Sequence, residues 1–189
     1  TEATAGAVTT TPGIPAPTVI PMGVEVQRFS TGDGTRLKKR LGETLRVILF
    51  VGRLVEKKGV TVLLDAYAKL PSDTRRRCRL WIVGDGDDRK DLEQQSRELH
   101  ITEGVWFAGR VANQDLPDYY TAADIFVAPS VVDEAGDTEG QGVVLLEAMA
   151  AGTAVVASRV GGISEVIEDG DSGTLVPPQD PQTLADALE

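Results

Sequence analysis

Short, continuous apolar runs alternate along this chain with longer stretches whose apolar residues recur at helical spacing. The first run covers residues 45–51, and the stretch after it keeps helical spacing until Pro71. A continuous apolar run is typical of a buried parallel strand, because helices cover both faces of such a strand. The alternation therefore predicts an α/β, Rossmann-like fold: a parallel sheet of about six strands with helices on both faces.

The other elements are predicted from the same two patterns. Further strands are expected at residues 80–83, 105–108, 124–128, 154–157 and 174–176. Helices are expected at residues 60–70, 87–100, 115–123, 142–151, 163–167 and 181–189, with Asn113 as a candidate N-cap of the third. In such folds ligands bind beyond the carboxyl ends of the strands, so the loops that follow the strands are the expected place of a site.

Composition excludes several classes of function. The 189 residues carry a net charge of −10, which argues against nonspecific binding to nucleic acid. No apolar run approaches the ~18 residues of a membrane-spanning helix. The single cysteine, Cys78, rules out an intrachain disulfide and fits a reducing compartment, and no secretory signal pattern is present. We therefore expect a cytoplasmic protein, in which any peripheral attachment to a membrane would come through a domain missing from this chain.

The start of the chain differs in composition from the rest. Residues 1–18 are rich in Thr, Ala, Gly and Pro, which is typical of a linker. We expect residues 1–44 to be an interdomain linker with a flexible segment, and residues 45–189 to be the binding domain. Within the first part, residues 19–29 could form a short strand with a turn, and the polar residues 30–43 a mobile surface segment or a short helix.

The stretch EGQGVVLLEAMAAG, residues 139–152, carries the strongest chemical signal. Glu147 is the only charged residue of the expected apolar helix, and a buried carboxylate is costly unless it meets a partner. Gly140 and Gly142 leave the free N–H groups of the helix start open to an anion. One interpretation places a phosphate on the helix start and hydroxyls at Glu139 and Glu147, as in a sugar nucleotide. A buried salt bridge at Glu147 and a simple helix-terminus acid at Glu139 are the alternatives.

This stretch resembles the signature EGxGxxxxEAMAxG of the retaining glycosyltransferases of family 4, which have the two-domain GT-B fold. The segment VIPMGVEVQRF at residues 19–29 is similar to the VIPNGVDxxRF segment that joins the two halves of these enzymes, with Met22 for Asn and Glu25 for Asp. The resemblance covers about residues 19–189. It implies that the chain is the carboxyl-terminal half, which binds the nucleotide-sugar donor.

The resemblance also implies a role for each loop. Arg53 and Lys58, in GRLVEKKG, would hold the donor diphosphate, although Lys57 is an adjacent candidate. Glu139 would lie beside the sugar hydroxyls and Glu147 would accept from the ribose. Arg53, Lys58 and Glu139 are the expected catalytic residues. The expected donor-binding residues are Gly52, Arg53, Lys58, Arg110, Val111, Glu139, Gln141, Gly142, Val143, Val144 and Glu147. No metal ion and no cofactor are expected.

The implied reaction transfers a sugar from a UDP-, GDP- or ADP-sugar to an acceptor hydroxyl with retention of the anomeric configuration. The acceptor-binding groups and a catalytic histidine would lie in the missing amino-terminal domain, so the isolated chain is expected to be inactive. His100, the only histidine, is given no catalytic role. A nucleotide-sugar-binding module without transfer activity and a sugar-nucleotide epimerase of related fold are the alternatives. A dehydrogenase is disfavoured because GDGDD at residues 84–88 lacks the third glycine of the dinucleotide fingerprint.

Overall fold

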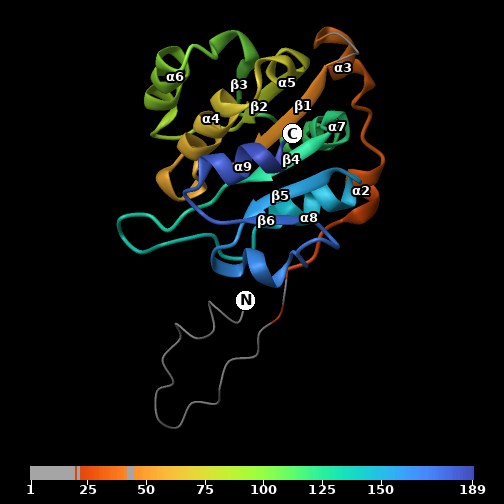
Figure 1. The fold of residues 1–189 in the computed structure, drawn as a ribbon. Coiled ribbons are helices and arrows are strands. Elements are labelled where there is room, and N and C mark those ends of the chain that lie inside the picture. Colours follow the sequence, from red (N-terminus) through yellow and green to blue (C-terminus); the bar gives the residue numbers. More distant parts are fainter. Residues whose placement is uncertain (1–19, 21, 42–44) are drawn as a thin grey trace, which may run out of the picture.

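The computed structural model describes residues 20, 22–41 and 45–189, and a six-stranded parallel sheet lies at their centre (Figure 1). The strands follow the order β3-β2-β1-β4-β5-β6 across the sheet. They are β1 (Arg46–Val51), β2 (Cys78–Val83), β3 (Val105–Gly109), β4 (Ile125–Ala128), β5 (Ala154–Ser158) and β6 (Thr174–Val176). Each neighbouring pair is parallel, so the predicted fold class is confirmed.

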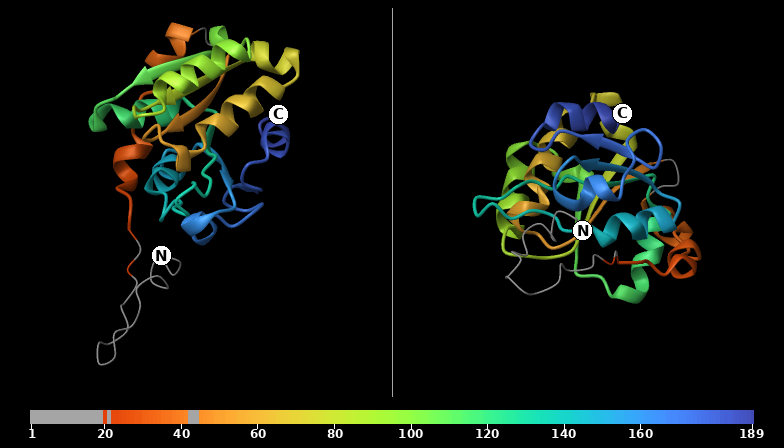
Figure 2. Two further views of the ribbon diagram at one scale, coloured as in Figure 1. Left: turned by 90° about the vertical axis from the view of Figure 1, so that its left-hand side faces the viewer. Right: turned by 90° about the horizontal axis from the view of Figure 1, so that it is seen from below.

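Helices cover both faces of this sheet (Figures 1 and 2). The α-helices are α2 (Val26–Ser30), α3 (Thr35–Leu41), α4 (Val60–Lys69), α5 (Ser72–Arg77), α6 (Arg89–Glu98), α7 (Leu116–Ala122), α8 (Val143–Ala150) and α9 (Pro181–Ala187). Short 3-10 turns are η1 (Glu56–Lys58), η2 (Thr102–Gly104), η3 (Asn113–Asp115) and η4 (Gly161–Glu165). Helices α4, α6 and α9 pack on one face, and α2, α7 and α8 pack on the other. None of the described helices is both long and apolar enough to cross a membrane.

Strand β1 is apolar at every position after the exposed Arg46, and its packing shows why. Val47 and Leu49 belong to the core under α7 and α8, whereas Ile48 and Phe50 belong to the core under α4. All four side chains are at most 2% exposed. Burying one such side chain stabilises the fold by about 1.5–3 kcal/mol, so a strand covered on both sides uses an apolar residue at every buried position.

Three local predictions were wrong. Helix α5 was not foreseen, because its sequence SDTRRR shows no apolar spacing and none of its residues is buried. Asn113 is not the N-cap of α7; that position is taken by Asp115, and Asn113 instead begins the 3-10 turn η3. The helix expected at residues 163–167 is the 3-10 turn η4, which begins two residues earlier.

The segment before β1 packs on the sheet-covering helices. Phe29, in α2, is 3% exposed and meets the ring of Tyr120 edge-on, with centroids 5.6 Å apart. The backbone N–H of Asp33 donates to the carboxylate of Asp118 in α7, at 2.8 Å. Helix α2 takes up the end of the range where a short strand was considered, residues 19–29, and no strand forms among the described residues of that range. The short helix considered for residues 30–43 is observed as α3. Residues 1–19, 21 and 42–44 lie outside the described part, and the domain boundary at residue 44 stays a prediction.

The loops at the carboxyl ends of the strands lie in direct backbone contact. Gly52 N–H donates to the carbonyl of Val83, at 2.9 Å. Gly84 has a φ of 134°, and a Cβ atom there would lie 1.8 Å from the carbonyl oxygen of Gly52. Gly59 has a φ of 64°, and its Cβ would lie 1.9 Å from the carbonyl oxygen of Pro129, which follows β4. Only glycine allows these loops to approach so closely.

We expect Gly59→Ala to destabilise the fold more than Gly152→Ala does. Both residues have positive φ, but a Cβ at Gly152 meets no atom within 4 Å, which makes this position the matched control for backbone strain alone. Gly152→Ala should lower the free energy of unfolding by about 1–2 kcal/mol, and Gly59→Ala by about 1–3 kcal/mol more because of the clash. Urea unfolding of both variants measures the difference, and equal losses would contradict the close approach.

Candidate functional site

The loops after β1, β2 and β3 enclose a hollow of about 370 Å³ at the carboxyl edge of the sheet. Its lining includes four of the predicted binding residues, namely Gly52, Arg53, Arg110 and Val111. Arg53 and Arg110 are both exposed, and Asp85 from the loop after β2 lies 3.9 Å from the Arg110 guanidinium. The hollow therefore presents two guanidinium groups beside apolar strand ends.

A second group of predicted residues lies at the same edge, between β1 and β5. The ammonium group of Lys58 forms an ion pair with the carboxylate of Glu139, and the two side chains are only 18% and 15% exposed. The loop after β5 holds the backbone of Glu139, because the N–H of Gly162 donates to the Glu139 carbonyl at 3.1 Å. A Cβ at Gly161 would lie 2.2 Å from that carbonyl oxygen. The glycine pair thus fixes the backbone of the residue that faces Lys58.

The adjacent Lys57 has a different partner. Its ammonium group lies 2.5 Å from the carboxylate of Asp137, and this hydrogen bond is the main reason why the pKa of Asp137 is lowered. The carbonyl of Lys57 also accepts from Val131 N–H, at 2.9 Å. The two lysines therefore attach the acidic loop after β4 to the loop after β1 at successive points.

Gly142 is the N-cap of helix α8 and has a φ of 67° and a ψ of 57°. No side chain caps this helix start. The N–H groups of the first turn of an α-helix, here beginning with Val143 and Val144, have no carbonyl partner within the helix. Both residues are half-buried. Such a helix start provides hydrogen-bond donors and a partial positive charge for an anion.

Glu147 lies in the middle of α8, half-buried, and accepts a hydrogen bond of 2.7 Å from the hydroxyl of Tyr120. Burial, and then the negative charge of Glu147, raise the pKa of Tyr120 well above its usual value. The phenol therefore stays protonated and donates to one carboxylate oxygen. Among the described residues no cation pairs with Glu147, so the salt bridge considered from the sequence is not formed there.

Sequence reasoning missed one residue that organises the site, Tyr120, and the side-chain role of a second, Gln141. Tyr120 was treated only as part of an expected helix, although a buried tyrosine hydroxyl usually finds a partner. Gln141 was expected to contribute its backbone N–H, but its side chain is also engaged. Its amide oxygen accepts from Met22 N–H at 2.8 Å, and its amide nitrogen donates to the Met22 carbonyl at 2.9 Å. Gln141 thus ties the start of α8 to the segment that enters the domain.

The structure brings the predicted residues to one sheet edge in these two groups. Gly52, Arg53, Arg110 and Val111 line the hollow, whereas Lys58, Glu139, Gln141, Gly142, Val143, Val144 and Glu147 lie at or near α8. Arg53 and Lys58 both belong to the loop after β1, with Arg53 exposed and Lys58 paired. Their convergence on a single anion stays a prediction.

Known proteins match nearly the whole described chain. A family model described as "Glycosyl transferases group 1" matches residues 34–189. D-inositol 3-phosphate glycosyltransferase of Geodermatophilus obscurus is 38% identical over 180 residues, covering 90% of this chain and 39% of the relative. GDP-mannose-dependent alpha-(1-6)-phosphatidylinositol monomannoside mannosyltransferase of Mycolicibacterium smegmatis is 36% identical, covering 89% and 45%.

A solved structure shows the same fold. The crystal structure of Anabaena HepE in complex with UDP-glucose superimposes with a TM-score of 0.80 at 32% identity, covering 90% of this chain and 46% of that chain. The chain therefore spans less than half the length of each of these three proteins.

We expect Tyr120→Phe to lower the free energy of unfolding by about 1–2 kcal/mol at neutral pH, because Glu147 loses a hydrogen bond while it stays half-exposed. The raised pKa of Tyr120 means that its protonated form stabilises the fold below the unfolded-state pKa of about 10, and that this contribution is lost as the pH rises further. Phenylalanine does not titrate, so the difference in the free energy of unfolding between the wild type and Tyr120→Phe should shrink at alkaline pH. Urea unfolding at neutral and alkaline pH measures it, and a constant difference would contradict this origin.

Proposed function

Because this chain belongs to the group 1 glycosyltransferase family, we propose that it is the half of such an enzyme that binds the nucleotide-sugar donor. One observation carries the proposal: Lys58, Glu139, the open start of α8 and Glu147 lie together at the carboxyl edge of a parallel sheet. Ligands of such sheets bind at this edge. The UDP-glucose complex of the similar HepE supports the same ligand class.

The diphosphate is the part of the donor that needs cations. A helix start contributes only about 0.3–1 kcal/mol at an exposed site, so Arg53 and Lys58 supply most of the positive charge. When the sugar leaves, negative charge grows on the diphosphate, and prearranged donors there lower the barrier. Lys58 is already held by Glu139, so little reorganisation is needed to place its ammonium group near the leaving group. Glu139 in turn lies where it can accept from the sugar hydroxyls.

The carboxylate of Glu147 is oriented to bind the ribose hydroxyls. Tyr120 occupies one of its oxygens, which fixes the carboxylate and leaves the other oxygen free to accept from two neighbouring hydroxyls. The base then lies in the hollow lined by Gly52, Arg110 and Val111. We propose a UDP-, GDP- or ADP-sugar as donor, without a metal ion or cofactor, and transfer with retention of configuration.

The acceptor would be held by the part of the enzyme outside this chain. The family match argues against the epimerase considered from the sequence, whereas a binding module without transfer activity describes what the isolated chain would do. The single cysteine fits the reducing conditions of a cytoplasmic location.

Glu147→Ala should weaken the binding of UDP, GDP or ADP, whichever binds, by about 1.5–3 kcal/mol, the value of hydrogen bonds to a charged group. Pyrophosphate has no ribose, so its binding should not change and serves as the control ligand for the same variant. Titration calorimetry of both ligands measures the effect. An equal loss for pyrophosphate would show a disturbed diphosphate site, and no loss for the nucleotides would exclude Glu147 from ribose binding.

The isolated chain should bind a nucleoside diphosphate and yet transfer no sugar. Transfer needs an acceptor hydroxyl held against the anomeric carbon, and such positioning supplies much of the rate. The test incubates the 189-residue chain with UDP-glucose or GDP-mannose and candidate acceptors, with Glu139→Ala as the background control. Glycosylated product above that background would show that this chain alone contains a complete active site.

A further inference from the structure

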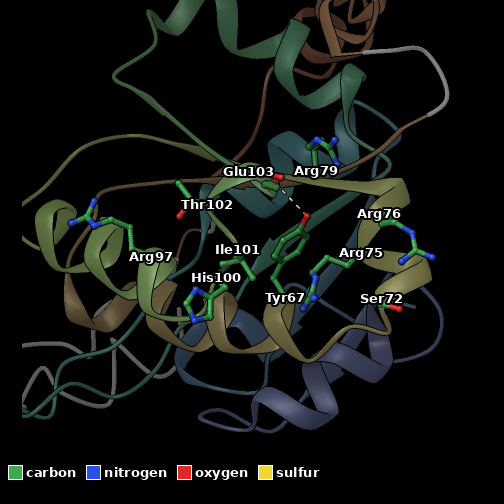
Figure 3. Close-up of a pocket in the computed structure, with 11 residues that line it drawn as sticks. Tyr67, Ser72, Arg75, Arg76, Arg79, Arg97, His100, Ile101, Thr102 and Glu103 are labelled. Carbon is green, nitrogen blue, oxygen red and sulfur yellow. Dashed lines mark hydrogen bonds between the residues drawn. The ribbon is translucent and has the colours of Figure 1, made fainter.

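A second hollow, of about 690 Å³, lies at the opposite edge of the sheet, where β2 and β3 begin (Figure 3). It is lined from the ends of α4, α5 and α6, from the start of β2 and from the turn η2. The charged and titratable residues that line it, apart from Tyr67, are Arg75, Arg76, Arg79, Arg97, His100 and Glu103. Four arginines therefore surround one hollow whose only acidic lining residue is Glu103, in a chain with a net charge of −10. We call it the arginine pocket.

Three of these arginines keep donors free. Arg75 donates to the carbonyl of Ala68 at 2.6 Å, and Arg79 donates to the carbonyl of Cys78 at 2.8 Å. Arg97 donates only to the side-chain oxygen of Gln94 on its own helix. Within the described part of the chain, these three guanidinium groups form no ion pair, whereas Arg76 pairs with Asp73. Each guanidinium has five N–H groups, so most donors of the three are still available.

The floor of the pocket is neutral and fixed. Tyr67 is fully buried, and its hydroxyl donates to the carbonyls of Cys78 and Gly104 at 3.1 and 3.3 Å. Burial raises the pKa of Tyr67 to about 12. The phenol thus adds no negative charge that would compete for the arginines.

Helix dipoles explain only part of this arrangement. A cation in the last turn of a helix gains about 0.3–1 kcal/mol, which accounts for Arg75 and Arg76 in α5 and for Arg97 in α6. Arg79 lies instead at the start of β2, next to the arginines of α5, and it extends the cationic cluster beyond any helix end. Neighbouring like charges repel each other, and a bound anion removes this cost.

We propose that the arginine pocket binds an anion that carries more than one phosphate group. Guanidinium groups recognise phosphate through paired hydrogen bonds. In Figure 3 Arg97 and Arg76 lie at opposite ends of the pocket, with Tyr67 and Arg75 between them, which fits an extended ligand better than a single phosphate. A soluble polyphosphorylated molecule and the phosphate headgroups of an anionic membrane share this chemistry. The pocket is separate from the proposed donor site and does not depend on it.

The single histidine allows binding at the arginine pocket to be observed selectively. Because His100 lines the pocket and is the only histidine, its ring resonances in an NMR spectrum report on this place alone. Titration of the 189-residue chain with inorganic tripolyphosphate should shift them saturably. The Arg79→Ala/Arg97→Ala variant should bind about tenfold more weakly or worse, as expected for two lost charged hydrogen-bond donors. Arg77→Ala is the matched control, because Arg77 is an exposed arginine of α5 that does not line the pocket.

A second arm distinguishes the two sources of phosphate. Co-sedimentation with phosphatidylcholine vesicles, with and without phosphatidylglycerol, should show binding that the double variant loses and Arg77→Ala keeps if the ligand is a membrane surface. Tripolyphosphate binding with this pattern, without vesicle binding, identifies a soluble ligand. If the double variant does not fold, Arg97→Glu alone, at an exposed position of α6, should weaken binding about tenfold. Absence of binding in both arms, or unchanged affinity in the folded pocket variants, overturns the proposal.

Discussion

The structure of the site depends on the close backbone approach of loops at the carboxyl edge of the sheet. Gly84 lies against the backbone of Gly52, Gly59 lies against Pro129, and Gly161 lies against Glu139. Each contact joins loops from different strands, and each would be blocked by a Cβ atom. Loops usually lie on the surface and are mobile. These contacts between loops therefore hold the backbone near Arg53, Lys58 and Glu139 in place.

The distribution of charge follows from this geometry. Lys57 and Lys58 pair with Asp137 and Glu139, so both lysines of the loop after β1 are balanced by carboxylates of the neighbouring loop. In the proposed donor site, an incoming diphosphate would share Lys58 with Glu139 instead of meeting an isolated cation. The arginine pocket at the opposite edge lacks such balance, since Glu103 is the one acid in its lining. The lysines near α8 are thus neutralised by ion pairs, whereas most arginines of the arginine pocket are not.

Much of the fold could be predicted, because both faces of the central strands are buried and their sequences are apolar except for Arg46 in β1 and Arg79 in β2. Glu147 could be singled out for the same reason, as the one charge in an apolar helix. Its partner Tyr120 could not, because their contact depends on how α7 packs against α8. The pairing of Gln141 with Met22 spans 119 positions, and helix α5 has no apolar face. Local patterns find elements and unusual residues, but contacts between elements depend on packing.

Helix α8 carries both the open helix start and Glu147, so it fixes the distance between them. Leu145 and Ala148 are fully buried, so the helix is held firmly against the sheet. From Val143, its first residue, to Glu147 the helix rises about 6 Å along its axis, at about 1.5 Å per residue. In the proposed site, an anion at this start and hydroxyls at Glu147 would therefore be neighbouring groups of one ligand. A nucleoside 5′-diphosphate, whose ribose directly follows the phosphates, has this order of groups. In the proposed donor site, α8 would therefore contact the nucleotide part of the donor, whereas Glu139, in the loop before α8, would contact the sugar.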